Sequence, residues 1–334
     1  MDFTEYRKIF RDIVKGKTEV LLQGKKFYIK HLSALDQVDI DDVKKMYYDS
    51  AIDRGIPSEA EVLKSLHDEG VWTEEEEKEI ENQKAFIGQL QKNKTQLVLK
   101  SQIDNQNKMI KETEEKINEL NTKKQELMGI NAESYSNKRA SDYYIIKSFY
   151  EDADLKNPLF PEEKDFNELY SEDIHELINT YNESFLNFDE LKIQTMILQD
   201  FYYIYFPFSD DTVGFFGNPV AKLTYNQLKL IVYTKIFKSI FENNKHIPEG
   251  IRKDPQALMD YGSIDEDAKN KLKERMEGGQ DGAMLFNATE EDFEYAGLDK
   301  PSDSPTMSLQ EAAKEKGGSL SMEDLMELSG HRTK

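Results

Sequence analysis

A run from Thr73 to Gly129 contains no proline, and its only internal glycine is Gly88. Apolar residues recur along it at seven-residue steps, in three rows: Leu90 and Leu97; Ile103, Ile110 and Ile117; Leu120 and Leu127. This spacing places side chains on one seam of a helix. Such a seam must fold back on its own chain, bind a sister chain or lie against a partner. The run therefore predicts a coiled-coil arm over residues 73–129, and it makes assembly the first functional inference.

The arm holds one irregularity, because the apolar rows change phase between Leu97 and Ile103. Such a shift marks either a stutter in one helix or a turn between two antiparallel helices, and periodicity favours neither. Acidic and basic residues are mixed along 74–128, twelve against ten, as on a solvated coiled-coil flank. We predict that four residues of the seam bind a partner: Ile103, Ile110, Ile117 and Leu120.

Composition limits the classes of partner and of chemistry. The 334 residues carry 65 acidic and 44 basic side chains, a net charge of -21, so nucleic acid and anionic membranes would repel the chain. The absence of cysteine excludes disulfides, zinc–thiolate sites, iron–sulfur clusters and thiol nucleophiles, and it fits a reducing cytoplasm. The amino-terminal residues lack a continuous apolar region, and no window reaches eighteen apolar residues. We expect no nucleic-acid partner and no membrane partner.

Before the arm, residues 1–72 predict a β-hairpin at 18–30 followed by short helices. The hairpin has β-branched and aromatic residues on both sides of its central glycine. A helix is expected over 34–54, and Ser58 with Glu61 forms a capping box for the next one. The only tryptophan, Trp72, is either a hydrophobic pin between this region and the arm or a ligand-stacking residue.

After the arm, residues 130–256 predict an aromatic-rich helical core. A helix is expected to continue to about Tyr150, and a strong one to cover 223–243. The buried face of the second helix is expected to hold Leu228, Ile231, Val232, Ile236, Ile240 and Phe241. Residues 201–216 hold eight of the chain's 36 aromatic side chains. That density indicates either buried core or a binding surface. Phe215 and Phe216 are our candidate partner contacts in this segment.

Residues 257–334 are poor in large apolar side chains and rich in glycine, aspartate and serine, which predicts a flexible acidic tail. Two short helical segments are expected in it, at 289–298 and near the carboxyl end. The second gathers three candidate anchors on one side of a helix: Met322, Leu325 and Leu328. It is either a docking peptide that folds on its partner or a frayed terminus.

The motifs that would carry chemistry are weak. Gly16-Lys17-Thr18 mimics the end of a phosphate-binding loop. Such a loop needs a glycine five residues before Gly16 and a helix directly after it, whereas Arg11 occupies that position and a strand is expected to follow. The five histidines are scattered, without a second ligand at metal spacing, and Asp210-Asp211 lacks the alternation of a calcium loop. We therefore expect no cofactor, no metal and no enzymatic activity. An enzyme assembled from distant carboxylates and tyrosines remains an alternative.

Several segments together show a resemblance to a known type of protein: FFGNPVAKLTYNQLKLIVYTKIFKSIFENNKHIPEGIRKDPQAL at 215–258, GVWTEEEEKEI at 70–80, KDPQALMDY at 253–261 and GGSLSMEDLMELSG at 317–330. The sequence resembles structural and assembly proteins encoded in the tail-gene clusters of large contractile-tailed bacteriophages. The match is to the type and not to one protein. It implies a mostly helical tail or baseplate component, or a chaperone that holds such a component before assembly.

The leading hypothesis is a non-enzymatic structural or assembly protein of a phage tail or baseplate. Its implied partners are other tail or baseplate proteins, or a second copy through the coiled coil, and its location is the host cytoplasm or the virion tail. The alternative is an acidic decoy that mimics nucleic-acid charge to bind a basic host protein. Against the decoy, the arm is nearly neutral and the acidic excess is spread along the chain.

Overall fold

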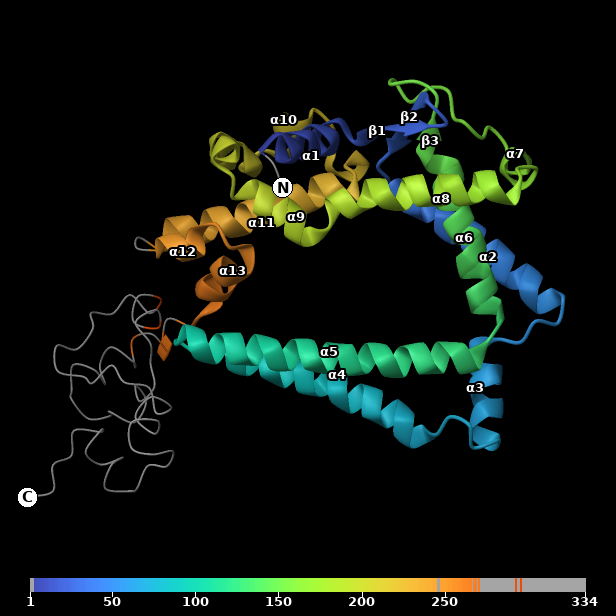
Figure 1. The fold of residues 1–334 in the computed structure, drawn as a ribbon, viewed down its shortest axis with the longest axis horizontal. Helices are drawn as coiled ribbons and strands as arrows, with labels where there is room; N and C mark the ends of the chain where they lie inside the picture. Colours follow the sequence, from blue (N-terminus) through green and yellow to red (C-terminus); the bar gives the residue numbers. More distant parts are fainter. Residues whose placement is uncertain are drawn as a thin grey trace, which may run out of the picture. The chain divides into compact units, whose positions relative to one another are not determined.

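A computed structural model describes residues 3–244, 247–265, 267, 268, 270, 292 and 295. The described chain is mainly helical with one small antiparallel sheet, which confirms the predicted fold class and the hairpin near the amino end (Figure 1). Its contacts form two compact units. The first combines Met1–Glu74 with Lys123–Ser239, and the second combines Glu75–Thr122 with Ile240–Lys334. The predicted 1–72 segment and most of the predicted 130–256 segment thus fall in one unit.

The sheet of the first unit has the strand order β1 (Lys17–Leu22), β2 (Lys25–Lys30), β3 (Phe149–Tyr150). Strands β1 and β2 pair from Lys17 opposite Lys30 to Leu22 opposite Lys25. Gln23 and Gly24 connect them with φ of 49° and 76°. A two-residue turn with positive φ at both positions matches the twist of paired strands, so this hairpin is confirmed.

Strand β3 corrects the sequence prediction, which continued a helix to Tyr150. Helix α6 (Ala132–Ser148) ends earlier, and Phe149 pairs with Ile29 of β2. Both side chains are fully buried in one apolar cluster. Burial of Phe149 between the sheet and helix α8 (Ser171–Phe185) therefore outweighs its local helical tendency.

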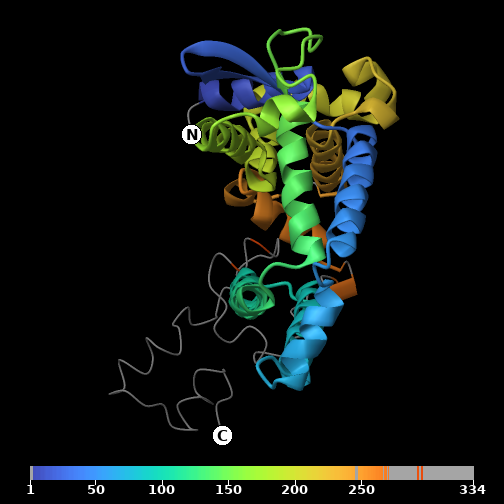
Figure 2. The same ribbon diagram turned by 90° about the vertical axis from the view of Figure 1, so that its right-hand side faces the viewer.

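The helices at the start of the first unit have clear end signals. Helix α1 (Phe3–Lys15) is followed by α2 (Ala34–Asp53) and α3 (Glu59–Asp68) after the hairpin. Ser33 with Asp36 caps α2, and Ser58 with Glu61 caps α3 as the sequence predicts. Helices α2 and α6 lie side by side (Figures 1 and 2). Trp72 follows α3 and is fully buried, as expected of a packing residue.

The rest of the first unit consists of short helices and one long one. Their bounds are α7 (Glu163–Asn167), η1 (Leu186–Phe188), α9 (Glu190–Ile197), η2 (Asp200–Asp210), α10 (Thr212–Phe216), η3 (Val220–Lys222) and α11 (Tyr225–Asn243). The η elements are 3-10 helices. Helix α11 confirms the helix predicted over 223–243, and its last residues belong to the second unit.

The predicted arm is two helices, α4 (Glu74–Lys94) and α5 (Lys100–Met128), of which residues 75–122 belong to the second unit. The connection at 95–99 contains the apolar group where the sequence pattern changes phase, and it is a turn and not a stutter. Near this turn Gln106 Nε2 of α5 donates to the Leu90 carbonyl of α4 at 3.1 Å. The two helices converge at the turn and separate toward their other ends (Figure 1).

Two short helices, α12 (Glu249–Arg252) and α13 (Pro255–Ser263), follow α11 in the second unit. Helix α13 corrects the prediction that a tail begins at residue 257. Asp254 caps it, with Pro255 in its first turn, and Leu258 and Tyr261 on its inner face are buried. Most of the remaining predicted tail lies outside the described residues.

Candidate functional site

The aromatic segment, defined as residues 200–216, is both core and surface. The side chains of its helix η2 divide between an inner and an outer side, because positions 202, 206 and 209 are buried and the residues between them are half-buried or exposed. Tyr202 and Phe206 are buried. The rings of Tyr202 and Tyr205 lie 5.5 Å and 4.8 Å from that of Phe10 in α1. The two alternatives for this segment therefore both apply, each to a different side of η2.

The outer side of the aromatic segment presents large apolar side chains to solvent. Ile204 is 67 % exposed, Phe208 59 % and Val213 50 %. Single exposed apolar residues are common on protein surfaces, whereas several in one short segment are typical of an interaction site. The segment thus offers a candidate protein-binding surface.

The buried side of the segment is held firmly against α11. The Tyr202 hydroxyl lies 2.8 Å from Thr234 Oγ1, and burial raises the pKa of Tyr202 so that the phenol stays protonated. Lys238 forms an ion pair with Asp210 at the end of η2. Asp211 accepts from the Gly214 N–H at 2.9 Å and so caps α10. The exposed side chains of η2 are therefore carried on an anchored scaffold.

Helix α11 also exposes a line of side chains, which we call the α11 stripe: Tyr225, Lys229, Val232 and Ile236. The opposite face of the helix is packed, since Leu230, Thr234 and Phe237 are fully buried. Glu190 of α9 flanks the stripe. It accepts from the Tyr233 hydroxyl at 2.7 Å and lies 3.8 Å from Lys229.

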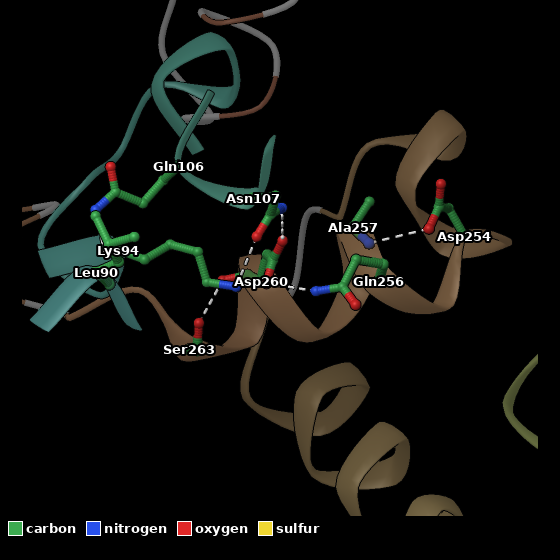
Figure 3. Close-up of polar contacts among 9 residues, drawn as sticks. All are labelled: Leu90, Lys94, Gln106, Asn107, Asp254, Gln256, Ala257, Asp260 and Ser263. Atoms are coloured by element: carbon green, nitrogen blue, oxygen red, sulfur yellow. Dashed lines mark hydrogen bonds and ion pairs between the residues drawn. The ribbon is translucent and has the colours of Figure 1, made fainter. Parts of the chain in front are cut away.

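In the second unit, a buried polar cluster joins the turn between α4 and α5 to α13 (Figure 3). Lys94 Nζ donates to Asp260 Oδ1 at 2.7 Å and to Asn107 Oδ1 at 2.9 Å. Asn107 Nδ2 donates to Asp260 Oδ2 at 2.8 Å, and Gln256 Nε2 donates to Asp260 Oδ1 at 2.9 Å. The Ser263 hydroxyl donates to the Asp260 carbonyl at 2.8 Å.

The geometry of this cluster indicates a structural role. The side chains of Lys94 and Asp260 are only 15 % and 7 % exposed, and both oxygens of the carboxylate already accept hydrogen bonds. A buried carboxylate that is paired and fully hydrogen-bonded holds its partners in place. We therefore interpret the cluster as a structural contact that fixes the turn between α4 and α5 to α13.

Further contacts reinforce the same turn. The Asp265 N–H donates to the Thr95 carbonyl at 2.9 Å, and Gln96 Nε2 donates to Asp265 Oδ2 at 3.1 Å. At the start of α5, the Ser101 N–H and hydroxyl donate to the Asp292 carboxylate at 2.7 Å and 3.0 Å. Asp292 thus satisfies one of the free N–H groups of the first helical turn from nearly two hundred residues away.

The Gly16-Lys17-Thr18 motif and the buried His31 have structural roles. Gly16, with φ of 65°, ends α1, and Lys17 begins β1. His31 is buried, with Nε2 2.9 Å from Thr18 Oγ1, and burial lowers its pKa to about 4. His246 and His331 lie outside the described residues. Within the described part of the chain, no three His, Asp or Glu residues are arranged to hold a metal ion.

The predicted partner-binding residues have different environments. Ile103, Ile110 and Ile117 are buried, whereas Leu120 is half-buried. Protected positions follow one face of α5 at spacings of three and four residues: 103, 106, 110, 113, 117 and 120. The seam is thus covered within the folded chain, and it needs neither a sister chain nor a partner to bury its apolar side chains. A coiled coil, and a partner at this seam, stay predictions.

Phe215 and Phe216 are half-buried, with ring centroids 4.7 Å apart, and Phe215 also lies 6.0 Å from Tyr205. They belong to the aromatic segment but are less exposed than Ile204 and Phe208. Met322, Leu325 and Leu328 lie outside the described residues, so their docking role stays a prediction.

Ile204, Phe208 and the α11 stripe were not predicted as surface from the sequence, and the assignment of Val232 and Ile236 to the buried face of this helix was wrong, since they are 53 % and 37 % exposed. A signal was present for the stripe. Tyr225, Val232 and Ile236 share one helix face, and residues 212–241 contain no acidic side chain. Ile204 and Phe208 lie between the buried positions 202, 206 and 209 of η2, and the sequence analysis did not use this spacing of four and three residues.

Among the described residues, no helix is long and apolar enough to cross a membrane. Comparisons with protein-family models, with curated proteins and with solved structures gave no significant match.

Proposed function

We propose that this protein is non-enzymatic and acts through protein–protein contacts, as a structural or assembly component. The observation that carries the proposal is the exposure of Ile204 and Phe208 on the anchored outer side of η2. Leaving a large apolar side chain in water forgoes about 1.5–3 kcal/mol of burial free energy. A partner that covers both side chains recovers that free energy.

The anchoring of the segment supports this interpretation. Tyr202 and Phe206 are buried in the same helix that exposes Ile204 and Phe208. The outer side chains are therefore presented in a fixed arrangement and lose little further freedom on binding. Preorganisation of this kind lowers the entropic cost of association.

For the biological setting we propose a phage tail or baseplate, on the sequence resemblance alone. The partners would then be other tail or baseplate proteins, with the chain in the host cytoplasm or built into the virion tail. Contacts through Phe215 and Phe216, through the seam of α5 and through Met322, Leu325 and Leu328 belong to this proposal. In the seam, Ile103, Ile110, Ile117 and Leu120 would contact a partner only after the covering side chains move away.

The proposal is tested by affinity purification from cells that naturally make the protein. The tagged full chain is compared with the double variant Ile204→Ser/Phe208→Ser, and co-purified proteins are quantified by mass spectrometry. We expect a defined partner whose recovery falls by about tenfold in the variant, because exposed anchors of this size dominate binding energy.

The matched control is Leu35→Ser/Val38→Ser, which removes two apolar side chains of similar exposure from α2. This control should retain the partner. Equal partner recovery with all three proteins, or no partner with any of them, would contradict the proposed function.

A further inference from the structure

The α11 stripe has the geometry of a helix-packing face. Tyr225, Val232 and Ile236 follow one another at intervals of seven and four residues, which keeps them on one side of the helix. They are 43 %, 53 % and 37 % exposed. A helix normally packs one apolar face and exposes a polar one. Helix α11 has a second apolar face that the described chain does not cover.

The charge around the stripe differs from that of the whole chain. Residues 212–241 contain four lysines, Lys222, Lys229, Lys235 and Lys238, and no aspartate or glutamate. The whole chain has 65 acidic residues among 334, so about six would be expected in a stretch of this length. Lys229 lies within the stripe, and Lys222 and Lys235 are exposed. Residues 212–241 therefore contribute only positive formal charge, in a protein with a net charge of -21.

Among the described residues, Asp211, which caps α10, and Glu242, which follows Phe241 in α11, lie at the two ends of this region, and two further carboxylates come from neighbouring elements. Glu190 of α9 pairs with Lys229 and Tyr233 on one flank of the stripe. Asp210 at the end of η2 pairs with Lys238. Lys229 is 39 % exposed and its ion pair spans 3.8 Å, so it can still contribute charge to a partner.

We propose that the α11 stripe is a docking surface for an acidic amphipathic helix supplied by a partner protein, an inference that rests on the proposed function and specifies the partner's chemistry. Apolar side chains at a spacing of seven and four match the seam of a second helix. Lysines beside such a seam select carboxylates on the flanks of the partner. Nucleic acid has no apolar seam to offer, and the net charge of the chain opposes an anionic membrane.

The test uses the full chain and a synthetic peptide of about 21 residues, three heptads with leucine at the two seam positions and glutamate on the flanks. A matched peptide carries lysine in place of every glutamate. Fluorescence anisotropy should show binding of the glutamate peptide only. The affinity should fall as salt rises from about 50 to about 300 mM, because screening weakens the contacts with lysine.

Two variants locate the site. Val232→Ser/Ile236→Ser removes apolar anchors, and Lys229→Glu/Lys235→Glu reverses the charge; each should weaken peptide binding by about tenfold. The matched controls on α2, Leu35→Ser/Val38→Ser and Lys44→Glu/Lys45→Glu, should bind the peptide as the natural chain does. All four change exposed side chains except at the half-buried Lys229, and circular dichroism verifies that each variant is folded.

Equal binding of the lysine peptide, or unchanged binding by both α11 variants, would overturn the inference. Binding of the chain to vesicles of phosphatidylserine and phosphatidylcholine that the α11 variants abolish would overturn it too, as would sedimentation showing a dimer that the same variants dissociate. The last result would assign the stripe to a second copy of the chain. The proposed function fails separately, since it depends on a cellular partner that is lost with Ile204→Ser/Phe208→Ser. A partner lost in that variant but retained by Val232→Ser/Ile236→Ser would sink only the present inference.

Discussion

Lys94 Nζ lies 2.7 Å from Asp260 Oδ1, a pairing that spans 166 residues of sequence and joins the turn between α4 and α5 to α13. Asn107 bonds to both partners. Because both charges are largely buried, the pair matters most when only one member is removed.

We predict that Asp260→Asn lowers the free energy of unfolding by about 3 kcal/mol, because it leaves the Lys94 ammonium buried without its counter-charge. The double variant Lys94→Met/Asp260→Leu should be less destabilised, since it removes both charges. Urea unfolding followed by circular dichroism measures the free energy of unfolding of the natural chain and of both variants. The control is Glu112→Gln, which breaks an exposed pair with Lys108 on α5 and should cost less than about 1 kcal/mol.

The seam of α5 gives a second prediction. Replacing Ile110 and Ile117 with Asp puts charges at buried positions and should cost several kcal/mol of stability. Because the seam is covered within the chain, the loss should be the same at low and at high protein concentration. Met109→Asp changes a neighbouring exposed residue and should be nearly neutral. A loss that appears only at concentrations where the chain associates would show instead that a second copy covers the seam.

Acid should destabilise the protein through His31. Its pKa is about 4 in the folded chain against 6.5 for the free side chain, because burial disfavours the charged imidazolium. Between these values the unfolded chain binds more protons. The free energy of unfolding is therefore unaffected by this residue above pH 6.5 and falls by about 3 kcal/mol as the pH drops toward 4.

The measurement is urea unfolding of the natural chain and of His31→Gln from pH 7 to pH 5. The quantity compared is the slope of the free energy of unfolding against pH, and not the free energy itself. The variant should have the smaller slope. His175→Gln, which changes an exposed histidine on α8, should leave the slope as it is. Equal slopes for the natural chain and His31→Gln would show that His31 is not held neutral.

One substitution should have opposite effects at two glycines. Gly24 has φ of 76° in the hairpin turn, where any other residue is strained, so Gly24→Ala should destabilise by about 1 kcal/mol. Gly88 lies inside α4 with no atom within 4 Å of an added Cβ, so Gly88→Ala should stabilise by about 0.5–1 kcal/mol. Thermal unfolding decides both. The same sign at both positions would contradict the assigned backbone conformations.

Local signals in the sequence predicted much of the fold. The glycine turn of the hairpin, the capping box at Ser58 and the apolar period of α11 each act within a few residues, so they are readable from sequence. Strand β3 was missed because Phe149 responds to burial against Ile29, more than a hundred residues away. The pairing of Lys94 with Asp260 was missed for the same reason.

The candidate site was predicted in part. Aromatic density located the segment at 201–216, but it does not tell which side of a 3-10 helix faces solvent. Phe215 and Phe216 were therefore preferred over the more exposed Ile204 and Phe208. The seam residues of α5 were recognised as apolar packing positions, whereas their burial within the chain depends on tertiary contacts.

Contact between the outer side of η2 and another protein is tested by site-specific photo-crosslinking. Benzoylphenylalanine replaces Phe208, whose exposed ring it resembles, in cells that naturally make the protein. The same group at the exposed position Asp49 of α2 is the control. We predict one discrete cross-linked protein from position 208 and none from position 49. Irradiation that gives no cross-link at position 208, or the same products at both positions, would contradict it.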